Sequence, residues 1–155
     1  MSQESKPRHR AGFIGRLLLW MLIPALSVAC ERTTRDTDIK YISVSESKAL
    51  FDRTQRGETG IALFIDPRPA KQFDAGHIPG ARNLTLPQVK PKSKPDPRIE
   101  KYTNLIVYGN DPASATARGM TKRLLEVGYD GVRFFAGGLE EWNERNYVLQ
   151  YLFQF

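Results

Sequence analysis

The sequence predicts an α/β domain whose central parallel sheet carries helices on both faces. Two wholly apolar runs, at residues 61–65 and 105–108, have the length and composition of strands covered on both sides, and a further strand is expected at residues 132–135. Helix signals follow these segments after short connections, and strands that alternate with helices in this way form parallel sheets. The length of 155 residues favours one domain with a substantial core.

The first helix of this domain has clear boundary signals. Ser43 and Glu46 have the spacing of a capping box, in which each side chain binds the backbone amide of the other residue. The helix then runs to about Arg56, and Gly57 suits its C-terminal turn. A strand at residues 39–42 precedes it.

The remaining predicted elements alternate along the chain. They are a short helix at 69–75, a strand at 81–86, a helix at 112–125 and a helix that follows Gly137-Gly138. Between two of the strands, residues 87–97 contain four prolines and read as an exposed connection. Its lysines are Lys90, Lys92 and Lys94. A solvated loop is expected there, and a docking patch for a protein partner is the alternative.

Composition excludes several function classes. Apolar content of 41% and charged content of 26% are typical of a globular protein. The net charge of +6 falls to +3 without residues 1–30, which hold four of the 23 basic and one of the 17 acidic residues, so nucleic-acid binding is not expected. One cysteine, Cys30, and two histidines, His9 and His77, do not suffice for a Cys/His metal cluster. We expect no metal and no cofactor.

Residues 1–30 read as an export signal. Four basic residues precede an uncharged run at 17–29, whose 13 residues suit a signal-peptide core and are too few for a spanning helix. The run ends Leu26-Ser27-Val28-Ala29-Cys30, which resembles the lipobox of bacterial lipoproteins, although Ser27 stands where that motif prefers leucine.

The lipobox resemblance implies that Cys30 is lipidated. Several acyl chains on one residue hold a protein durably on a membrane, here one of the bacterial cell envelope, facing the periplasm or the exterior. An uncleaved anchor, or a signal cut elsewhere, is the alternative. Residues 31–38 are polar and read as a short tether.

Four separated segments of the domain resemble the rhodanese family. They are Asp66-Pro67-Arg68, the run Gly76-His77-Ile78-Pro79-Gly80-Ala81, the strand–loop–helix at 105–125, and Gly128-Tyr129 followed by Val132, Gly137-Gly138 and Trp142. They agree with the family in order and spacing over residues 39–148. The resemblance implies a single rhodanese-like domain with the parallel sheet described above.

The resemblance also implies a missing catalyst. Family sulfurtransferases carry a nucleophilic cysteine at the position matching Gly109, where loop amides and a helix N-terminus stabilise a thiolate and its persulfide. That thiolate takes sulfur from a sulfane donor and passes it to an acceptor, which glycine cannot do. The degenerate loop consists of Gly109, Asn110, Asp111, Pro112, Ala113 and Ser114. We therefore expect no thiosulfate sulfurtransferase activity.

Other groups in this loop have ordinary structural explanations. Ser114 has no evident partner base, and a nucleophilic serine requires one. Asp111 could act as an acid or base, but Asp-Pro is also a common helix start, so Asp111 or Ser114 is expected to cap the following helix. The resemblance implies an arginine or a serine near the loop end that holds the anion. Ser114 is present there, an arginine is not, and Arg118 lies one turn into the helix.

The remaining motif residues are expected to be structural. Gly76 and Gly80 bracket a tight turn, and His77 can pin the backbone within it, with a catalytic role as the alternative. Asp66 and Arg68 are expected to hold neighbouring loops, with a catalytic pair as the alternative. Gly138 and Trp142 are the other motif residues expected to be structural, with Trp142 as a core aromatic.

The C-terminal tail, residues 149–155, continues a period-two pattern that starts at Tyr147. Such a pattern predicts an edge strand with an aromatic face. Packing on the domain itself is expected, and a partner-binding strip is the alternative.

These observations favour an exported, membrane-anchored rhodanese-like domain that lacks the catalytic cysteine and serves as a binding or scaffolding module. The alternative is a sulfurtransferase-related enzyme, or a sulfur carrier, that uses another loop group or the thiol of a partner.

Overall fold

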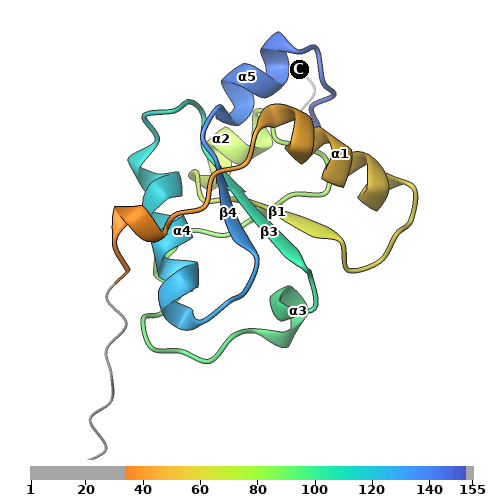
Figure 1. Ribbon diagram of the computed structural model, residues 1–155. Coiled ribbons are helices and arrows are strands. Elements are labelled where there is room, and N and C mark those ends of the chain that lie inside the picture. The colour runs from red at the N-terminus through yellow and green to blue at the C-terminus, as the bar shows by residue number, and fades with distance from the viewer. Residues whose placement is uncertain (1–33, 153–155) are drawn as a thin grey trace, which may run out of the picture. The chain divides into compact units, whose positions relative to one another are not determined.

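The structure is a computed structural model that describes residues 34–152 (Figure 1). The predicted export signal, Cys30 and the first three residues of the tether lie outside the described residues, as do the last three residues of the tail. Residues 31–155 form a compact unit of their own. No helix within residues 34–152 is long and apolar enough to cross a membrane.

Four parallel strands form the sheet, in the spatial order β2-β1-β3-β4. The strands are β1 (Ala62–Asp66), β2 (Arg82–Asn83), β3 (Asn104–Tyr108) and β4 (Val132–Phe135). The α-helices are α1 (Val44–Gln55), α2 (Ala70–Asp74), α3 (Pro97–Glu100), α4 (Ala115–Val127) and α5 (Gly138–Glu144), and two short 3₁₀ helices are η1 (Asp36–Asp38) and η2 (Leu86–Gln88). The predicted α/β fold with a parallel sheet is confirmed.

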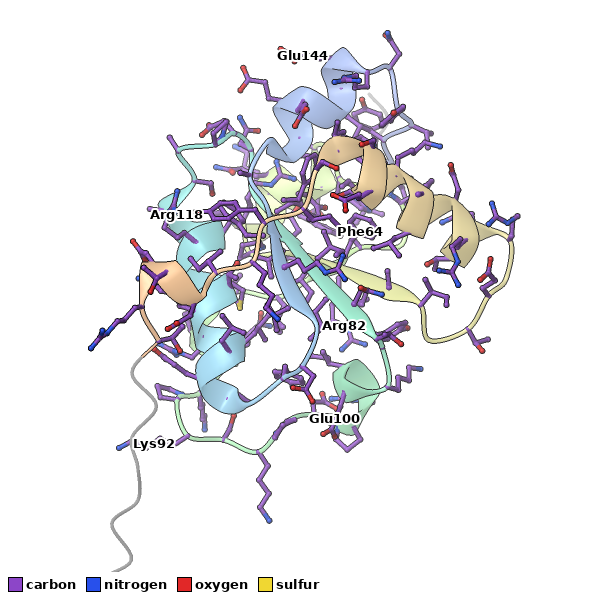
Figure 2. All side chains as sticks on the ribbon, viewed as in Figure 1. Phe64, Arg82, Lys92, Glu100, Arg118 and Glu144 are labelled. Carbon is purple, nitrogen blue, oxygen red and sulfur yellow. The ribbon has the colours of Figure 1, made fainter. Side chains whose placement is uncertain are left out.

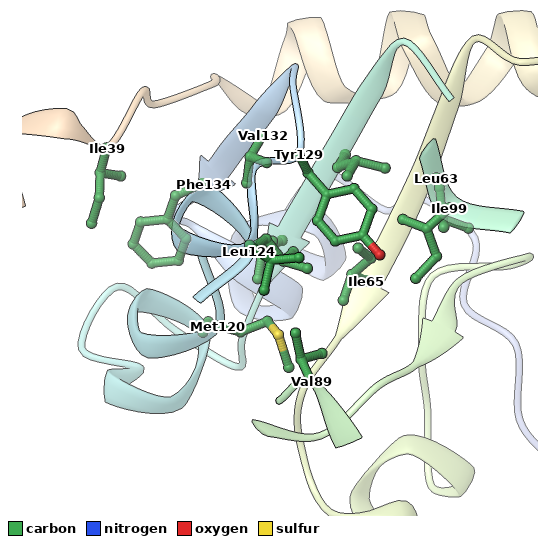
Figure 3. Close-up of a cluster of buried hydrophobic side chains, with 14 residues drawn as sticks. Ile39, Leu63, Ile65, Val89, Ile99, Met120, Leu124, Tyr129, Val132 and Phe134 are labelled. Atoms are coloured by element: carbon green, nitrogen blue, oxygen red, sulfur yellow. The ribbon is translucent and has the colours of Figure 1, made fainter. Parts of the chain in front are cut away.

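One face of the sheet packs against α4 (Figure 3). Successive side chains of a strand point to opposite faces, so Leu63 and Ile65 of β1 lie on the same side. There they join Met120 and Leu124 of α4, together with Val89 from the connection after η2. The apolar residues spaced along α4 therefore build this half of the core.

The other face packs against α1 and α5. Phe64 of β1 meets Phe51 of α1 and Trp142 of α5, with ring centroids 6.2 Å and 6.0 Å away. Phe51 and Trp142 are themselves 5.4 Å apart in an edge-to-face arrangement. Trp142 is fully buried at the centre of this aromatic cluster, as its predicted role as a core residue requires.

The boundaries of α1 match the prediction. Ser43 Oγ accepts from the Glu46 amide at 3.3 Å, and the Glu46 carboxylate accepts from the Ser43 amide at 3.1 Å. Arg56 caps the helix, and Gly57 follows with a φ of +87°, a conformation that glycine adopts freely.

The predicted strand at residues 39–42 is wrong in extent. Only an isolated bridge joins Tyr41 to Phe134 of β4, with hydrogen bonds from the Ile42 amide to Phe134 O at 3.1 Å and from the Phe134 amide to Lys40 O at 2.8 Å. The segment is too short for a full strand because η1 ends immediately before it and the capping box of α1 begins at Ser43.

The predicted strand at 81–86 is likewise reduced to the two residues of β2. Thr85 turns the chain into η2, where its amide donates to Gln88 Oε1 at 2.7 Å and Pro87 cannot supply a ladder donor. The connection at 87–97 is also more regular than predicted, because Pro87 lies in η2 and Pro97 opens α3 behind the N-cap Asp96.

Candidate functional site

The motif segments meet at the edge of the sheet where the strands end. Asp66 closes β1, loop 109–114 follows β3, and Gly138 opens α5 directly after β4. In open α/β sheets this edge is where ligands bind, because the loops after parallel strands converge there. The turn at residues 76–80 joins the group through the contacts described next.

A buried ion pair fixes the turn after β1. Arg68 donates from Nε to Asp66 Oδ1 at 3.0 Å and from Nη2 to Asp66 Oδ2 at 2.7 Å, and both side chains are almost fully buried. Nη2 also donates to the Gly76 carbonyl at 2.7 Å. The pair thus ties the end of β1 to the glycine turn.

Asn83 of β2 braces the same turn from the other side. Its Nδ2 donates to the carbonyls of Asp66 at 2.9 Å and of Arg68 at 2.8 Å. No feature of the sequence pointed to Asn83, since an amide that binds backbone carbonyls at a distant strand end and in the turn after it has no local signature.

His77 is engaged by its own surroundings. Nδ1 lies 2.8 Å from the Phe73 carbonyl, which can only accept, so this nitrogen carries the proton. The ring stacks on Phe73 with centroids 3.7 Å apart, and the residue is 3% exposed. Its backbone pairs with Gln150 of the tail through two hydrogen bonds. These contacts make His77 a brace of the turn.

Tyr108, at the end of β3, links the sheet to the glycine turn. Its hydroxyl accepts a hydrogen bond from the Ile78 amide at 3.2 Å, and the side chain is fully buried. Burial, and next the negative charge of Asp66, raise the pKa of Tyr108 well above its usual value. The sequence prediction took this residue as one more apolar strand position, although a phenol at a strand end usually signals a hydrogen-bond partner.

Gly109 has no room for a side chain. A Cβ atom on this residue would overlap Oγ and Cβ of Ser114 and would lie 3.2 Å from Cβ of Ala117. Ser114 caps α4, with its Oγ accepting from the Ala117 amide at 3.4 Å. The α4 helix therefore starts at Ala115, three residues later than predicted, and its cap fills the space above Gly109.

The loop also satisfies part of its own hydrogen-bonding capacity. Asp111 Oδ1 accepts from the Ala113 amide at 2.8 Å, and the Asp111 carbonyl accepts from the Ser114 amide at 3.2 Å. Pro112 has no amide hydrogen to offer. The Asp111 carboxylate therefore occupies the Ala113 amide, which would otherwise be available to an external anion.

Arg118 points away from this loop. Its Nη1 donates to the Tyr41 hydroxyl at 3.0 Å, and its guanidinium lies 5.4 Å from the ring centroid of Phe134. Arg118 thus braces the N-terminal segment against β4.

The start of α5 closes the loop from the opposite side. The Leu139 amide donates to the Gly109 carbonyl at 3.1 Å, and the Glu140 amide donates to the Asn110 carbonyl at 2.9 Å. Gly138 makes this approach with a φ of +58°, and a Cβ atom there would lie 2.6 Å from Gly109 O. Glycine is required at 138 for both reasons.

An open cavity of about 700 Å³ lies beside the loop. Its lining residues include the buried Arg68, the polar residues Gln72, Asn110 and Asn143, and the acidic Glu140. Leu149 and Tyr151 of the tail supply apolar surface. The mixed lining suits a ligand with both polar and apolar parts.

The tail forms less of a strand than predicted. In its described part, residues 149–152, one bridge joins Gln150 to His77, and the Leu152 amide donates to Asp74 O at 3.0 Å. Tyr147 packs on Trp142 with ring centroids 5.0 Å apart, whereas Tyr151 is 51% exposed. The pattern breaks into separate contacts because the turn at 74–77 offers a bent edge and not an extended strand.

Among residues 34–152, no group of three His, Cys, Asp or Glu side chains is arranged to hold a metal ion.

The family model for the rhodanese-like domain matches residues 46–145. This chain belongs to the rhodanese-like domain family. The matched residues carry all four motif segments, which lie between α1 and α5.

Curated relatives of this rhodanese-like chain are much longer proteins. The protein named "Adenylyltransferase and sulfurtransferase UBA4" of Lodderomyces elongisporus is 36% identical over 116 residues, covering 68% of this chain and 24% of the relative. Its namesake in Candida albicans is 31% identical over 93 residues, covering 53% and 19%. This chain therefore spans a quarter or less of the length of these relatives.

Solved structures share the fold. The thiosulfate sulfurtransferase of Pseudomonas aeruginosa superposes with a TM-score of 0.54 at 21% identity, covering 77% of this chain and 21% of that one. The rhodanese-like domain of an Anabaena protein superposes with a TM-score of 0.53 at 20% identity, covering 72% and 78%.

Proposed function

We propose that this rhodanese-like domain binds a ligand or protein partner without transferring sulfur, and that it works while anchored to a membrane of the bacterial cell envelope. The observation that carries the first half is the overlap between Ser114 and any side chain at position 109. A sulfurtransferase needs room above that position for a thiolate and for the sulfur atom it receives.

The hydroxyl that fills this space is poorly suited to replace a thiol. Ser114 Oγ is engaged as the cap of α4, where it accepts from the Ala117 amide. A serine nucleophile needs a neighbouring base to take its proton. The one histidine of the described domain, His77, binds the Phe73 carbonyl through Nδ1 and stacks on the Phe73 ring.

Anion binding in the loop is also disfavoured. A persulfide or a thiosulfate would compete with the Asp111 carboxylate, which already accepts from the Ala113 amide at 2.8 Å. An anion bound at the same amide would lie next to the negative charge of Asp111 and be repelled by it, so it would enter only if the Asp111 side chain moved away. The α5 amides of Leu139 and Glu140 are taken by loop carbonyls.

The cavity beside the loop supports a binding role. Its lining combines the charged residues Arg68 and Glu140 with three amide-bearing residues and the aromatic Tyr151. Polar groups that converge on an open cavity of this size are typical of a ligand or peptide site.

The membrane half of the proposal rests on residues 1–30. The basic segment, the uncharged run and Cys30 have the order of a lipoprotein signal. Lipidation would give the mature chain durable attachment, because each acyl chain adds apolar surface to the anchor.

Sulfur transfer from thiosulfate to cyanide tests the non-catalytic role. We expect the purified full chain to form thiocyanate no faster than buffer does. The Cys30→Ser variant is the matched control, since it removes the chain's only thiol and leaves residues 34–152 unchanged. Turnover above the buffer rate in both proteins would overturn the proposal.

Metabolic labelling with a palmitate analogue tests the anchor. We expect label on the wild-type chain and none on Cys30→Ser. Equal labelling of both proteins, or none on either, would contradict lipidation of Cys30 and favour an uncleaved anchor or another cleavage site.

The names of the curated relatives include the word sulfurtransferase, which favours one alternative. In that alternative the chain takes part in sulfur transfer through another loop group or through the thiol of a partner. Thiocyanate formation that appears only when a thiol-bearing partner protein is added, and that is lost when that partner's thiol is blocked, would favour it.

A further inference from the structure

The chain enters the described domain toward the edge where the strands begin. The ion pair between Lys122 Nζ and Asp36 Oδ1, at 2.9 Å, holds η1 against α4. Because α4 connects two parallel strands, it runs back against their direction, and Lys122 in its second half lies toward the starting edge. This edge is opposite the candidate site.

A lipid on Cys30 would keep this edge close to a bilayer. Only three residues separate Cys30 from Thr34, the first described residue. A polypeptide extends by at most about 3.6 Å per residue, so Thr34 would lie within about 14 Å of the lipidated residue. The point where the chain enters the domain would therefore stay close to the membrane.

The loop after η2 brings positive charge to the same edge. Residues 75–95 contain Arg82, Lys90, Lys92 and Lys94 and no acidic residue. The three lysines are exposed, and they precede α3, which leads into the start of β3. Figure 2 shows Lys92 at the end of the domain away from Glu144 of α5.

This lysine loop is fixed at both ends. Arg123 Nη1 donates to the Val89 carbonyl at 2.7 Å, and the Val89 side chain is buried in the core. At the other end, the Asp96 amide donates to the Tyr129 hydroxyl at 2.7 Å. Arg123 follows Lys122 directly, so one turn of α4 holds both η1 and the loop. The lysines are presented by a braced loop next to the point of chain entry.

We propose that Lys90, Lys92 and Lys94 bind the anionic headgroups of the bilayer that carries the anchor. This inference rests on the proposed membrane attachment. Basic residues near an anionic leaflet strengthen association by about fivefold each, so three would contribute about a hundredfold. The domain would then lie with its starting edge on the membrane, and the cavity at the opposite edge would face an aqueous partner.

Lysine acylation tests this surface on the full chain. The protein is reconstituted in vesicles of phosphatidylcholine alone or of equal parts phosphatidylcholine and phosphatidylglycerol, and the acylation rate of each lysine is read by peptide mass. We expect Lys90, Lys92 and Lys94 to react about fivefold or more slowly on the anionic vesicles. Lys71 of α2 should react equally on both, and high salt should abolish the difference.

A charge-matched pair of variants separates the loop from a general charge effect. The Lys90→Gln/Lys92→Gln/Lys94→Gln variant should lose the slowing of amide hydrogen exchange in residues 89–96 that anionic vesicles cause in the wild type. The control, Lys48→Gln/Lys71→Gln/Arg145→Gln, removes the same charge from the first half of α1, from α2 and from the end of α5, and should keep it.

Equal acylation on both vesicles, or equal exchange in wild type and loop variant, would overturn the inference. Intact mass reports lipid on Cys30 separately. An unlipidated chain held by residues 17–29 would refute the lipoprotein anchor while leaving the lysine test valid, because the chain would still enter the domain at the same edge.

Discussion

The side chain of Ser114 lies where a Cβ atom on Gly109 would be. The two positions are therefore coupled: the N-cap of α4 is compatible with glycine at 109 and with no larger residue in the same loop geometry. The space left by the missing side chain at position 109 is filled by Ser114. This relationship also predicts the stability of variants at both positions.

Gly109→Ala should destabilise the domain by about 1–3 kcal/mol, because the added methyl overlaps Ser114 and must displace it. Adding Ser114→Gly should restore most of this loss, since glycine at an N-cap costs only a few tenths of a kcal/mol. Urea denaturation of the two single variants and the double variant measures the coupling.

The matched control for this pair is Gly119→Ala on α4. A Cβ atom there would make an ordinary contact, 3.4 Å from Cδ1 of Leu86, and alanine favours the helix. Gly119→Ala should therefore leave stability unchanged or raise it. Equal losses at positions 109 and 119, or purely additive effects of Gly109→Ala and Ser114→Gly, would contradict the coupling.

The tripeptide Asp-Pro-Arg occurs twice, and the two copies differ in burial. Arg68 and Asp66 have side chains 8% and 0% exposed, whereas Arg98 and Asp96 have side chains 81% and 32% exposed. Arg68→Ala should cost about 3–5 kcal/mol, because it leaves the Asp66 charge buried without its partner. Arg98→Ala breaks a pair of the same form in solvent and should leave the thermal midpoint unchanged. Similar losses of stability in Arg68→Ala and Arg98→Ala would contradict the expectation that burial determines the cost of breaking each ion pair.

Tyr108→Phe should cost about 1–3 kcal/mol, because the buried Ile78 amide loses its acceptor. The variant should also change the pH dependence of stability. The raised pKa of Tyr108 means that the folded state holds this proton more tightly than the unfolded chain. The contribution of the Tyr108 hydroxyl to the free energy of unfolding is therefore complete below about pH 10, and it declines as the pH rises above that value.

Urea midpoints of wild type and Tyr108→Phe, measured between neutral pH and pH 11, test both effects. The free-energy difference between the two proteins should shrink at the alkaline end, since ionisation penalises only the wild type. A difference that stays constant with pH would contradict the inferred pKa shift.

Two tyrosines of the C-terminal period-two pattern should behave differently. Tyr147 packs on Trp142 and lies 5.1 Å from the Lys48 ammonium, so Tyr147→Ala should cost about 2 kcal/mol. Tyr151 is exposed beside Gly76 and lines the cavity, so Tyr151→Ala should change stability by no more than about 0.5 kcal/mol.

Thermal unfolding and capture of binding partners from membrane extracts separate these roles. Tyr151→Ala should weaken partner capture while the domain stays folded. Capture unchanged in Tyr151→Ala would remove the tail from the proposed binding site, and unfolding of this variant would assign it to packing alone.

The sequence predicted the fold well where local patterns and chain order suffice. The apolar runs at β1 and β3, the capping box at Ser43, and the glycine turns required no knowledge of distant contacts. The strand predicted at 39–42 was wrong because its pairing with β4 depends on where η1 ends and α1 begins.

The site was harder to predict because its decisive contacts join residues from different elements. Sequence spacing identified Gly109 and Ser114, yet only the fold brings the cap of α4 over the glycine. The partners of Tyr108 and Asn83 lie 30 and 15 to 17 residues away in the chain. No local pattern specifies such hydrogen bonds.

The most direct test of the account is the intact mass of the full chain after incubation with thiosulfate. The account predicts that Cys30→Ser gains no sulfur, because the space above Gly109 is filled and the loop offers no thiol. A retained sulfur adduct that maps to residues 109–114 of this variant would contradict it.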